Sequence, residues 1–453
     1  MTKRRRVRFP HIAALLVTLA FLAATPAYPS GFQLMNQDAR AMGMGLAFTA
    51  VADDPAAIFY NPAGLGFQKH FGVVFGGSLL TRTQGDFDGA NPYPGVGDSE
   101  HLRKSSYFLP TLYVTAPLTP DISFGLGIFA PYGLGYRWED PNSVTGRPFT
   151  GRFISQYSYI QTADINPVIS FQATPAVAFA VGVDYRLSKV QLERNLCAGP
   201  PGCTVPFPVA LDIAHVKLNS DLTSNHGWGW NAGVMIRPVP QLSLGVAYRS
   251  HIKVDYSGDA TFQQILTGIP PLDAGVAATL PPGTQTVNTS IDFPSSLNLG
   301  AAVMLTGGLT ISGEADWTEW TRFKALNITF PALPGGTTCA PLGIAVCRMT
   351  VWDDSWAYRI GLEKKFAIFA VRAGYYHDNT PQPVADAGPL LADSNRNGYT
   401  LGFGIGTDRW GVDISDLYLK FKDRDTRSSS NDGFFGVYKE AANVVALRLH
   451  LAF

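Results

Sequence analysis

The sequence predicts an all-β protein, a 14-stranded antiparallel transmembrane β-barrel plugged by a small N-terminal hatch. Its composition is the first reason. Only 15% of the 453 residues are charged, 12% are aromatic and 46 are glycine, whereas soluble domains carry about 25% charged residues. Second, long segments after residue 70 alternate apolar and polar side chains. Third, no apolar run beyond the first thirty residues reaches the roughly 20 residues that a membrane helix needs.

The first thirty residues have the organisation of a secretory signal peptide. Five basic residues precede an apolar run from Ile12 to Ala24, and two prolines follow. This run is too short to cross a bilayer comfortably, which makes an uncleaved anchor the weaker alternative. We expect residues 1–30 to be the signal peptide, with cleavage between Ala27 and Ser30.

Residues 31–69 do not follow the barrel pattern and are rich in glycine, proline and small residues. They could hang in the periplasm or fold into the barrel lumen. Aromatic side chains such as Phe32, Phe48 and Phe59 favour a packed plug over a solvated tail. We therefore predict a hatch at residues 31–69 and a barrel at residues 70–453.

Fourteen strand candidates follow the hatch, an even number as bacterial barrels require. In the last, Val445, Leu447 and Leu449 share one face and Arg448 and His450 the other, which suits lipid outside and a polar lumen. The candidates lie at residues 70–83, 105–117, 121–137, 156–173, 176–194, 226–237, 241–257, 290–305, 308–326, 350–365, 367–378, 397–408, 411–423 and 436–453.

The connections between these candidates are alternately short and long. Short periplasmic turns and long outer loops are typical of outer-membrane barrels, so the pattern predicts the orientation. The long connections lie at residues 84–104, 138–155, 195–225, 258–289, 327–349 and 379–396.

The four cysteines form two close pairs in predicted outer loops, Cys197 with Cys203 and Cys339 with Cys347. In an exported protein such pairs indicate disulfides, although pairing across the two loops stays open. A metal site is the alternative, but the spacings match no common zinc pattern and no histidine lies close by. We expect no metal and no cofactor. The formal net charge of zero gives no reason to expect a nucleic-acid partner.

Three motifs stand in the predicted hatch: Gly31-Phe32-Gln33-Leu34, Ala52-Asp53-Asp54 and Asn61-Pro62-Ala63. They resemble the N-terminal hatch of the FadL family, which includes fatty acid transporters and TodX-like aromatic hydrocarbon channels. Further segments resemble its strands: Gly227–Gly233, Tyr248–Asp255, Trp317–Trp320 and Ala357–Ile360. The resemblance implies a monomeric, multi-pass barrel in the outer membrane, surrounded by lipid and lipopolysaccharide. The C-terminal Phe453 resembles the signal that the outer-membrane assembly machinery recognises.

The resemblance also implies passive uptake of a hydrophobic small molecule, a fatty acid or a hydrocarbon. Family members capture the ligand outside, pass it to a pocket in the barrel and release it sideways at a kink in the third strand. Ala130-Pro131-Tyr132-Gly133 interrupts the third candidate here. Proline removes a ladder donor and glycine permits unusual backbone angles. We expect the lateral opening at these four residues, with an ordinary bulge as the alternative.

The resemblance assigns gating roles to the hatch. Gly31 and Phe32 form the hatch tip, whose movement is thought to open the pocket in relatives, and Asp378 matches an aspartate near that tip. Asn61, Pro62 and Ala63 match a motif that the family needs for transport. For Asn61, a turn-capping role that only holds the hatch fold is the alternative.

Ligand binding is expected at Phe32, Arg194 and Arg348. Arg194 matches a family arginine that meets the ligand carboxylate, and a guanidinium can hold a carboxylate with two hydrogen bonds. A rim arginine that pairs with Glu193 or faces lipopolysaccharide is the alternative. The family's second basic residue falls near Thr350, so Arg348, two positions away, is the nearest candidate. This departure leaves neutral hydrocarbons open as ligands.

Three other functions compete with uptake. An open aqueous porin and a structural or adhesive barrel are the main alternatives. An outer-membrane lipase or protease is less favoured, because the sequence contains no G-x-S-x-G and no H-E-x-x-H motif. We do not expect an enzyme.

Overall fold

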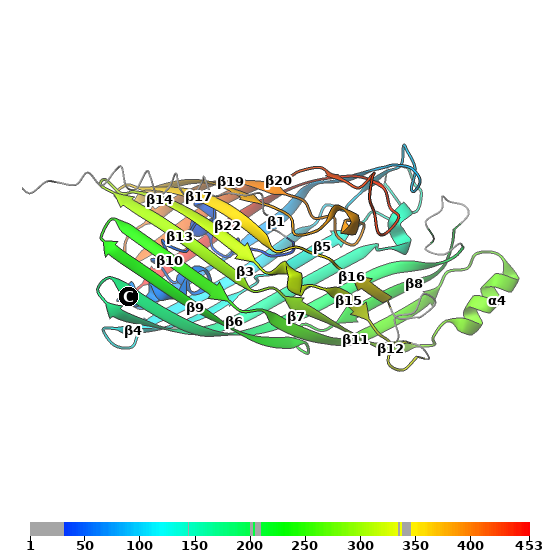
Figure 1. Cartoon of the computed structure of the whole chain (residues 1–453), viewed down its shortest axis with the longest axis horizontal. Coiled ribbons are helices and arrows are strands. Elements are labelled where there is room, and N and C mark those ends of the chain that lie inside the picture. Colours follow the sequence, from blue (N-terminus) through cyan, green and yellow to red (C-terminus); the bar gives the residue numbers. More distant parts are fainter. Residues whose placement is uncertain (1–30, 144, 200–202, 204–209, 334–335, 338–345) are drawn as a thin grey trace, which may run out of the picture.

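The wall of the molecule is one antiparallel sheet that closes on itself, because β1 (Gly72–Gly89) pairs with β3 (Ser106–Pro117) on one side and with β22 (Gly436–Ala452) on the other. The computed structural model describes residues 31–143, 145–199, 203, 210–333, 336–337 and 346–453. The predicted signal peptide therefore lies outside the described residues. Figure 1 shows the barrel lengthwise, with the C-terminus at the end that carries the short turns.

Fourteen spans form the described wall, as the sequence predicted. β1, β3 and β22 are three of these spans. The other eleven, of which four are divided into two segments joined here by "with", are β4 (Ile122–Phe129) with β5 (Gly133–Arg137), β6 (Tyr157–Thr174), β7 (Val177–Ala198), β8 (Leu211–Ser220) with β9 (His226–Val239), β10 (Leu242–Arg249) with β11 (Ile252–Gln264), β12 (Thr284–Phe293) with β13 (Ser296–Leu305), β14 (Leu309–Thr318), β17 (Ser355–Lys365), β18 (Phe369–Asp378), β19 (Arg396–Gly406) and β20 (Trp410–Phe421).

The predicted division into a lipid face and a lumenal face is visible along β22. Leu447 is 55% exposed and Leu449 41%, whereas Arg448 between them is 4% exposed. A spanning sheet must close in this way because lipid offers no hydrogen bonds to free backbone groups. Among the described residues, no helix is long and apolar enough to cross a membrane.

The wall extends further outward than the sequence predicted. The expected loop at residues 195–225 contains β8, which pairs with both β7 and β11. The expected loop at residues 258–289 contains the end of β11, the start of β12 and the helix α4 (Pro270–Thr279), which forms the outer tip in Figure 1. These predictions were wrong because the backbone groups of the strands continue to pair beyond the membrane. The flanking sequence is rich in turn residues and shows no clear alternation of apolar and polar side chains there.

Two predicted strands were too long at their outer ends. β14 ends at Thr318 and β17 begins at Ser355, against predicted spans of 308–326 and 350–365. The intervening chain instead forms the short helix η3 (Trp320–Arg322) and a separate hairpin of β15 (Ala325–Ile328) and β16 (Val346–Met349). The remaining short elements near this end are β2 (Ser99–His101), β21 (Arg424–Asp425), η2 (Thr150–Phe153) and η4 (Val384–Asp386).

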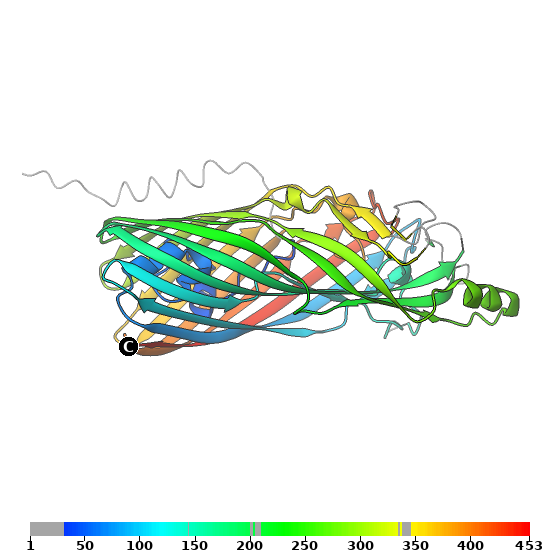
Figure 2. The same cartoon turned by 90° about the horizontal axis from the view of Figure 1, so that it is seen from below.

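Residues 31–69 lie inside the barrel. They contain α2 (Ala39–Gly43), α3 (Ala57–Tyr60) and η1 (Pro62–Phe67), which appear in blue within the wall in both views (Figures 1 and 2). We call this segment the hatch. It packs so closely against the wall that a Cβ atom added at Gly361 would lie 2.2 Å from the Met44 carbonyl oxygen.

One predicted disulfide can be assessed. Cys197, at the outer end of β7, is bonded to Cys203, as the sequence predicted. The predicted partner of Cys347, Cys339, lies outside the described residues.

Candidate functional site

The third span of the wall breaks where the sequence predicted an opening. β4 ends at Phe129 and β5 begins at Gly133, so Ala130, Pro131 and Tyr132 separate the two segments. β4 pairs with β3 only from Leu112↔Ile128 downward, and β5 pairs with β6 but not with β3. The upper part of β3 and β5 therefore face each other without ladder hydrogen bonds. We call this gap, between Ser106–Thr111 and Tyr132–Arg137, the wall window.

The hatch takes over the backbone hydrogen bonds that the break would otherwise leave unmade. The Gln37 side-chain amide donates to the Ala130 carbonyl at 2.8 Å and accepts from the Ala130 N–H at 3.0 Å. The Leu34 N–H donates to the Pro131 carbonyl at 2.8 Å, and the Gly133 N–H donates to the Phe32 carbonyl at 3.0 Å. Because buried backbone groups need partners, the N-terminal segment of the hatch stabilises the kinked span.

The wall window has an upper and a lower border. The lower border is the Leu112↔Ile128 pair of β3 and β4. At the upper border the Arg103 N–H donates to the Arg137 carbonyl at 2.8 Å. Tyr107 lies across the gap: a Cβ atom added at Gly135 would lie 2.2 Å from its ring. Only glycine at position 135 therefore leaves room for the Tyr107 ring.

A cavity of about 380 Å³ connects the hatch tip to this window. Its inner lining includes Gly31, Phe32 and Asp378, and its outer lining includes Phe108 and Pro110 of β3. We call it the lumenal cavity. Phe108 is 63% exposed on the outside of the wall, so the lining of the cavity includes a residue whose side chain faces outward.

Phe32, at the hatch tip, sits in a cage of five aromatic rings. The ring centroids of Trp320 and Phe323 lie 4.9 and 5.6 Å from that of Phe32. Tyr132 and Phe293 lie at 6.0 Å and Trp352 at 6.1 Å. Edge-to-face contacts of this kind stabilise the packing beyond the buried area alone. One cage member, Tyr132, belongs to the strand break itself.

The hatch tip is held by an aspartate that the sequence did not single out. The Gly31 N–H donates to Asp393 Oδ2 at 3.0 Å. Asp378, the predicted aspartate, lines the lumenal cavity but pairs with Arg396 at 3.0 Å and with Arg359 at 3.4 Å. Asp378 thus lies near the tip without a hydrogen bond to it, and the direct contact comes from Asp393.

A second, smaller cavity lies on the outer side of Phe32. About 50 Å³ is free there, and the lining is mostly apolar, including Leu134, Ile160, Phe323 and Trp352. We call it the aromatic pocket. Phe32 lines both this pocket and the lumenal cavity, so its side chain stands between them.

The two candidate ligand arginines have different surroundings. Arg348 lines the aromatic pocket but is paired with Asp432 at 3.0 Å and donates to the Asp386 carbonyl at 2.9 Å. Burial raises the pKa of the Asp432 carboxyl, although Arg348 acts in the opposite direction. A ligand carboxylate would have to compete with Asp432 for Arg348.

Arg194 lies near the outer end of β7, on the lumenal face by its alternation with the buried Arg186 and Val190. Its side chain makes no hydrogen bond or ion pair with any residue that the structure describes. Arg194 does not line the aromatic pocket. The structure therefore does not bring the two candidate arginines into one site.

Asn61 joins the hatch to the wall. Its side-chain amide donates to the Thr49 carbonyl at 3.0 Å and to the Val234 carbonyl of β9 at 3.1 Å. Its oxygen accepts from the Ala63 N–H at 3.2 Å and so caps η1. Pro62 begins η1, where proline is favoured because its ring fixes the first helical angle. These contacts support the fold-holding role of the Asn61-Pro62-Ala63 motif.

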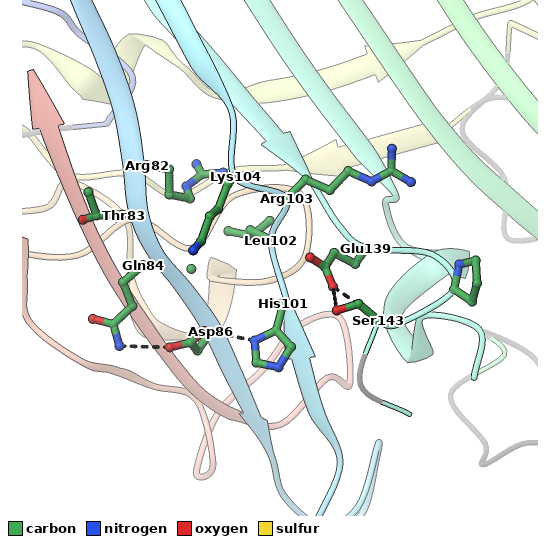
Figure 3. A pocket seen from close by; sticks show the side chains of 12 residues that line it. Arg82, Thr83, Gln84, Asp86, His101, Leu102, Arg103, Lys104, Glu139 and Ser143 are labelled. Atoms are coloured by element: carbon green, nitrogen blue, oxygen red, sulfur yellow. Dashed lines mark hydrogen bonds and ion pairs between the residues drawn. The ribbon is translucent and has the colours of Figure 1, made fainter. Parts of the chain in front are cut away.

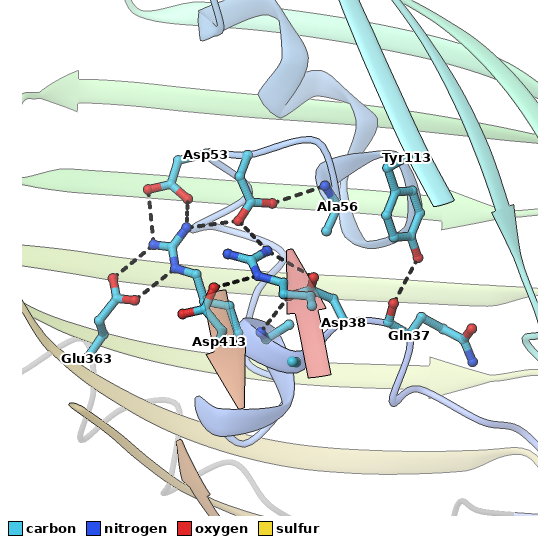
Figure 4. Close-up of polar contacts among 12 residues, drawn as sticks. Gln37, Asp38, Asp53, Ala56, Tyr113, Glu363 and Asp413 are labelled. Atoms are coloured by element: carbon cyan, nitrogen blue, oxygen red, sulfur yellow. Dashed lines mark hydrogen bonds and ion pairs between the residues drawn. The ribbon is translucent and has the colours of Figure 1, made fainter. Parts of the chain in front are cut away.

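Buried ion pairs fix the hatch at the periplasmic side of the lumen. Arg40 of the hatch pairs with Glu363 of β17 at 2.8 Å. Arg448 of β22 pairs with Asp38 and Asp54 of the hatch, both at 2.9 Å. Figure 4 shows the carboxylates of Asp38 and Glu363 joined to guanidinium groups in this layer. Removing one partner of a buried pair costs about 3–5 kcal/mol, so this layer resists displacement and offers an apolar ligand no favourable path.

The sequence identified the kink but missed the residues that complete it. Gln37, Tyr107, Gly135 and Asp393 all act across long sequence separations. Glycine and tyrosine are common in membrane strands, so neither stood out. Only the glycine alternation in Gly133-Leu134-Gly135 gave a signal that this edge needed space.

Comparison with known proteins agrees with this architecture. The family described as "Outer membrane protein transport protein (OMPP1/FadL/TodX)" matches residues 20–453. A long-chain fatty acid transport protein of Salmonella typhi is 22% identical over 402 residues, 85% of each chain. Outer membrane protein P1 of Haemophilus influenzae is 25% identical over 449 residues, 90% of each chain.

Two solved structures have the same fold. A Pseudomonas aeruginosa FadL homologue superposes with a TM-score of 0.75 at 21% identity, covering 94% of this chain and 100% of that one. The toluene transporter TodX of P. putida gives a TM-score of 0.65 at 19% identity, covering 88% and 94%.

Proposed function

Because this chain belongs to the outer membrane transport family OMPP1/FadL/TodX, we propose that it captures a hydrophobic molecule outside, holds it in the aromatic pocket and lumenal cavity, and releases it through the wall window. Membership places the chain in the outer membrane of a Gram-negative bacterium and makes it a transporter of hydrophobic compounds rather than an enzyme. The route within the barrel is the part that we propose.

One observation carries the proposal: the residues that line the lumenal cavity include both the hatch tip and the part of β3 that borders the wall window. An apolar ligand gains about 25 cal/mol for each Å² of surface removed from water. A sideways path keeps that surface buried throughout, whereas a path toward the periplasm would lead through the charged layer between hatch and wall, where apolar contacts are lost. The hatch tip, at Gly31 and Phe32, stands where the pocket and the cavity meet and would gate the transfer.

An open aqueous porin fits less well. The stretch Asn36–Ala52 is buried throughout and fills the lumen. Steady, large ion conductance of the purified protein in planar bilayers would favour the porin. A purely adhesive barrel would leave the aromatic pocket and the window without a role.

Uptake by whole cells tests the proposal. In cells that lack their own transporter, the intact chain should restore uptake of labelled hexadecanoate, hexadecane or toluene. Deleting residues 31–35 should impair that uptake severalfold, because Phe32 and the Leu34 backbone contacts are lost, while the heat-modifiable barrel still inserts. Normal uptake by the deletion variant would contradict the gating role of the hatch tip.

The ligand is either a fatty acid or a neutral hydrocarbon, as the names of the relatives also suggest. Arg194, which has no ionic partner in the described part of the chain, favours a carboxylate. Arg348, already paired with Asp432, favours a neutral ligand in the aromatic pocket. We propose that carboxylates bind first at Arg194 and that the aromatic pocket receives the apolar tail or ring.

Arg194→Ala is expected to weaken the binding of hexadecanoate about tenfold, since a charge-assisted hydrogen bond contributes about 1.5–3 kcal/mol. Hexadecane binding should stay within twofold of the intact protein (about 0.4 kcal/mol or less). Competition binding with the purified protein measures both. Arg427→Ala is the matched control, because Arg427 lies in an outer loop and, among the described residues, forms an ion pair only with Asp425. Equal losses for acid and alkane would remove the proposed role of Arg194.

A further inference from the structure

A cleft of about 690 Å³ opens on the outer part of the wall beside the window. It lies between β1 residues Arg82–Asp86, the segment His101–Lys104 and the loop at Glu139–Ser143. We call it the outer cleft. Figure 3 shows Lys104 extending toward β1, while Arg103 extends in the opposite direction. The Asp86 carboxylate is hydrogen-bonded to the His101 ring at 3.0 Å, and the Glu139 carboxylate accepts a hydrogen bond from the Ser143 hydroxyl.

The outer cleft adjoins the upper border of the wall window. The Arg82 N–H donates to the Ser105 carbonyl at 3.2 Å, just above Tyr107. Below this level the outward face of β1 and β3 is apolar, with Leu79 and Phe108 exposed. At Thr81 and Ser106, whose hydroxyls are hydrogen-bonded at 2.9 Å, that face becomes polar. The cleft therefore lies at the height where hydrocarbon gives way to lipid head groups.

Arg82 belongs to both compartments, because it lines the outer cleft and the lumenal cavity. Its guanidinium lies 4.7 Å from the centre of the Tyr136 ring, and its Nε atom lies 3.9 Å from Glu440 Oε2. Glu440 is more closely engaged by the Tyr136 hydroxyl. The buried Nη1 atom of Arg82 has no hydrogen-bond partner within the described structure.

Two more cations stand free on the outer side of Arg82. Arg103 and Lys104 are exposed and line the cleft. Neither side chain has a hydrogen bond or an ion pair with a described residue. The lining of the cleft thus contains three cationic side chains, those of Arg82, Arg103 and Lys104, against the two carboxylates of Asp86 and Glu139, and its formal charge is positive.

We propose that Arg82 and Lys104 form an exit site for the carboxylate of an anionic amphiphile, such as a fatty acid. This inference rests on the proposed lateral release. Arg82 would take the carboxylate from the lumenal cavity while the alkyl tail passes the window. Lys104 would then receive the carboxylate at the membrane surface, leaving the tail among the lipid chains.

The chemistry of the leaving ligand favours such a site. A carboxylate that enters hydrocarbon without a partner loses its hydration, which is strongly unfavourable. A guanidinium or ammonium group at the window's upper border replaces the lost water with charge-assisted hydrogen bonds. The arrangement also orients the ligand, with the head group toward the lipid head groups and the tail below. A neutral alkane would need none of these groups.

Release into phosphatidylcholine vesicles that contain no lipopolysaccharide tests the exit site. Reconstituted protein is loaded with hexadecanoate or with hexadecane, and transfer to the bilayer is timed. Arg82→Gln should slow hexadecanoate release about tenfold, since it removes one charged hydrogen bond. Lys104→Gln should slow it about threefold, because charge interactions of an exposed side chain are weaker. Hexadecane should be released at an unchanged rate. Lys104 is exposed, so its substitution leaves the fold intact even if that of Arg82 does not.

Lys439→Gln is the matched control, because Lys439 of β22 faces outward and pairs with Asp88. Equal slowing of acid and alkane, or no slowing of either, would overturn the exit site. So would an effect that appears only in vesicles containing lipopolysaccharide, because the cleft would then hold a lipid phosphate. If the intact protein releases neither compound, lateral release itself is wrong and the exit site falls with it.

Discussion

Replacing Pro131 with threonine and Gly133 with valine in one variant is expected to reduce uptake of hydrophobic compounds at least tenfold. Threonine restores the missing ladder donor, and both residues favour extended backbone. The third span can then run on from β4 into β5 and pair with the upper part of β3. A paired strand leaves no gap between Ser106–Thr111 and Tyr132–Arg137. Uptake of labelled hexadecanoate by whole cells measures the loss.

Pro167→Val is the matched control for this variant. Pro167 also lies in a membrane strand, but in β6, where it keeps its place opposite Leu126. It is not among the residues that line the lumenal cavity. The control should therefore leave uptake unchanged. If the double variant folds into the membrane and transports like the intact protein, the ligand does not leave by the wall window.

Much of the barrel could be predicted because closure in lipid constrains the chain at every residue. Each wall residue faces either hydrocarbon or lumen, and the alternation along β22 records this directly. Above the membrane the constraint disappears. β8 still pairs with β7 and β11, but its outward residues meet water and need not be apolar. The alternation of apolar and polar residues therefore weakens in this region, although the hydrogen bonds between the strands continue.

The candidate site was predictable only where a residue type acts alone. Pro131 and Gly133 change the backbone by themselves, so the kink could be placed from the sequence. Tyr107 of β3 and Gly135 of β5 pack against each other across the wall window. β3 and β5 form no ladder hydrogen bonds, so no strand register could have predicted this contact. The same holds for Gln37, whose amide satisfies a backbone 93 residues away. Such contacts depend on the closed fold rather than on local pattern.

Phe32→Ala is expected to tighten the binding of toluene by about tenfold or more. In the intact protein a phenyl ring already occupies the cage of Tyr132, Phe293, Trp320, Phe323 and Trp352. A ligand that enters must first displace it. Emptying a buried phenylalanine site costs about 3–5 kcal/mol, and this cost is subtracted from the affinity. The alanine variant has lost the ring already, which enlarges the aromatic pocket, and apolar cavities of about 150 Å³ bind small aromatic molecules.

Phe48→Ala separates this effect from a general loosening of the hatch. Phe48 is also a fully buried phenylalanine of the hatch, but it lines neither the lumenal cavity nor the aromatic pocket. The Phe48→Ala substitution should lower the stability of the hatch without raising the affinity for toluene. Titration calorimetry on both purified variants compares them. Toluene affinity that is unchanged or reduced in Phe32→Ala would mean that the phenyl ring does not compete with the ligand, and the hatch tip would then not gate the aromatic pocket.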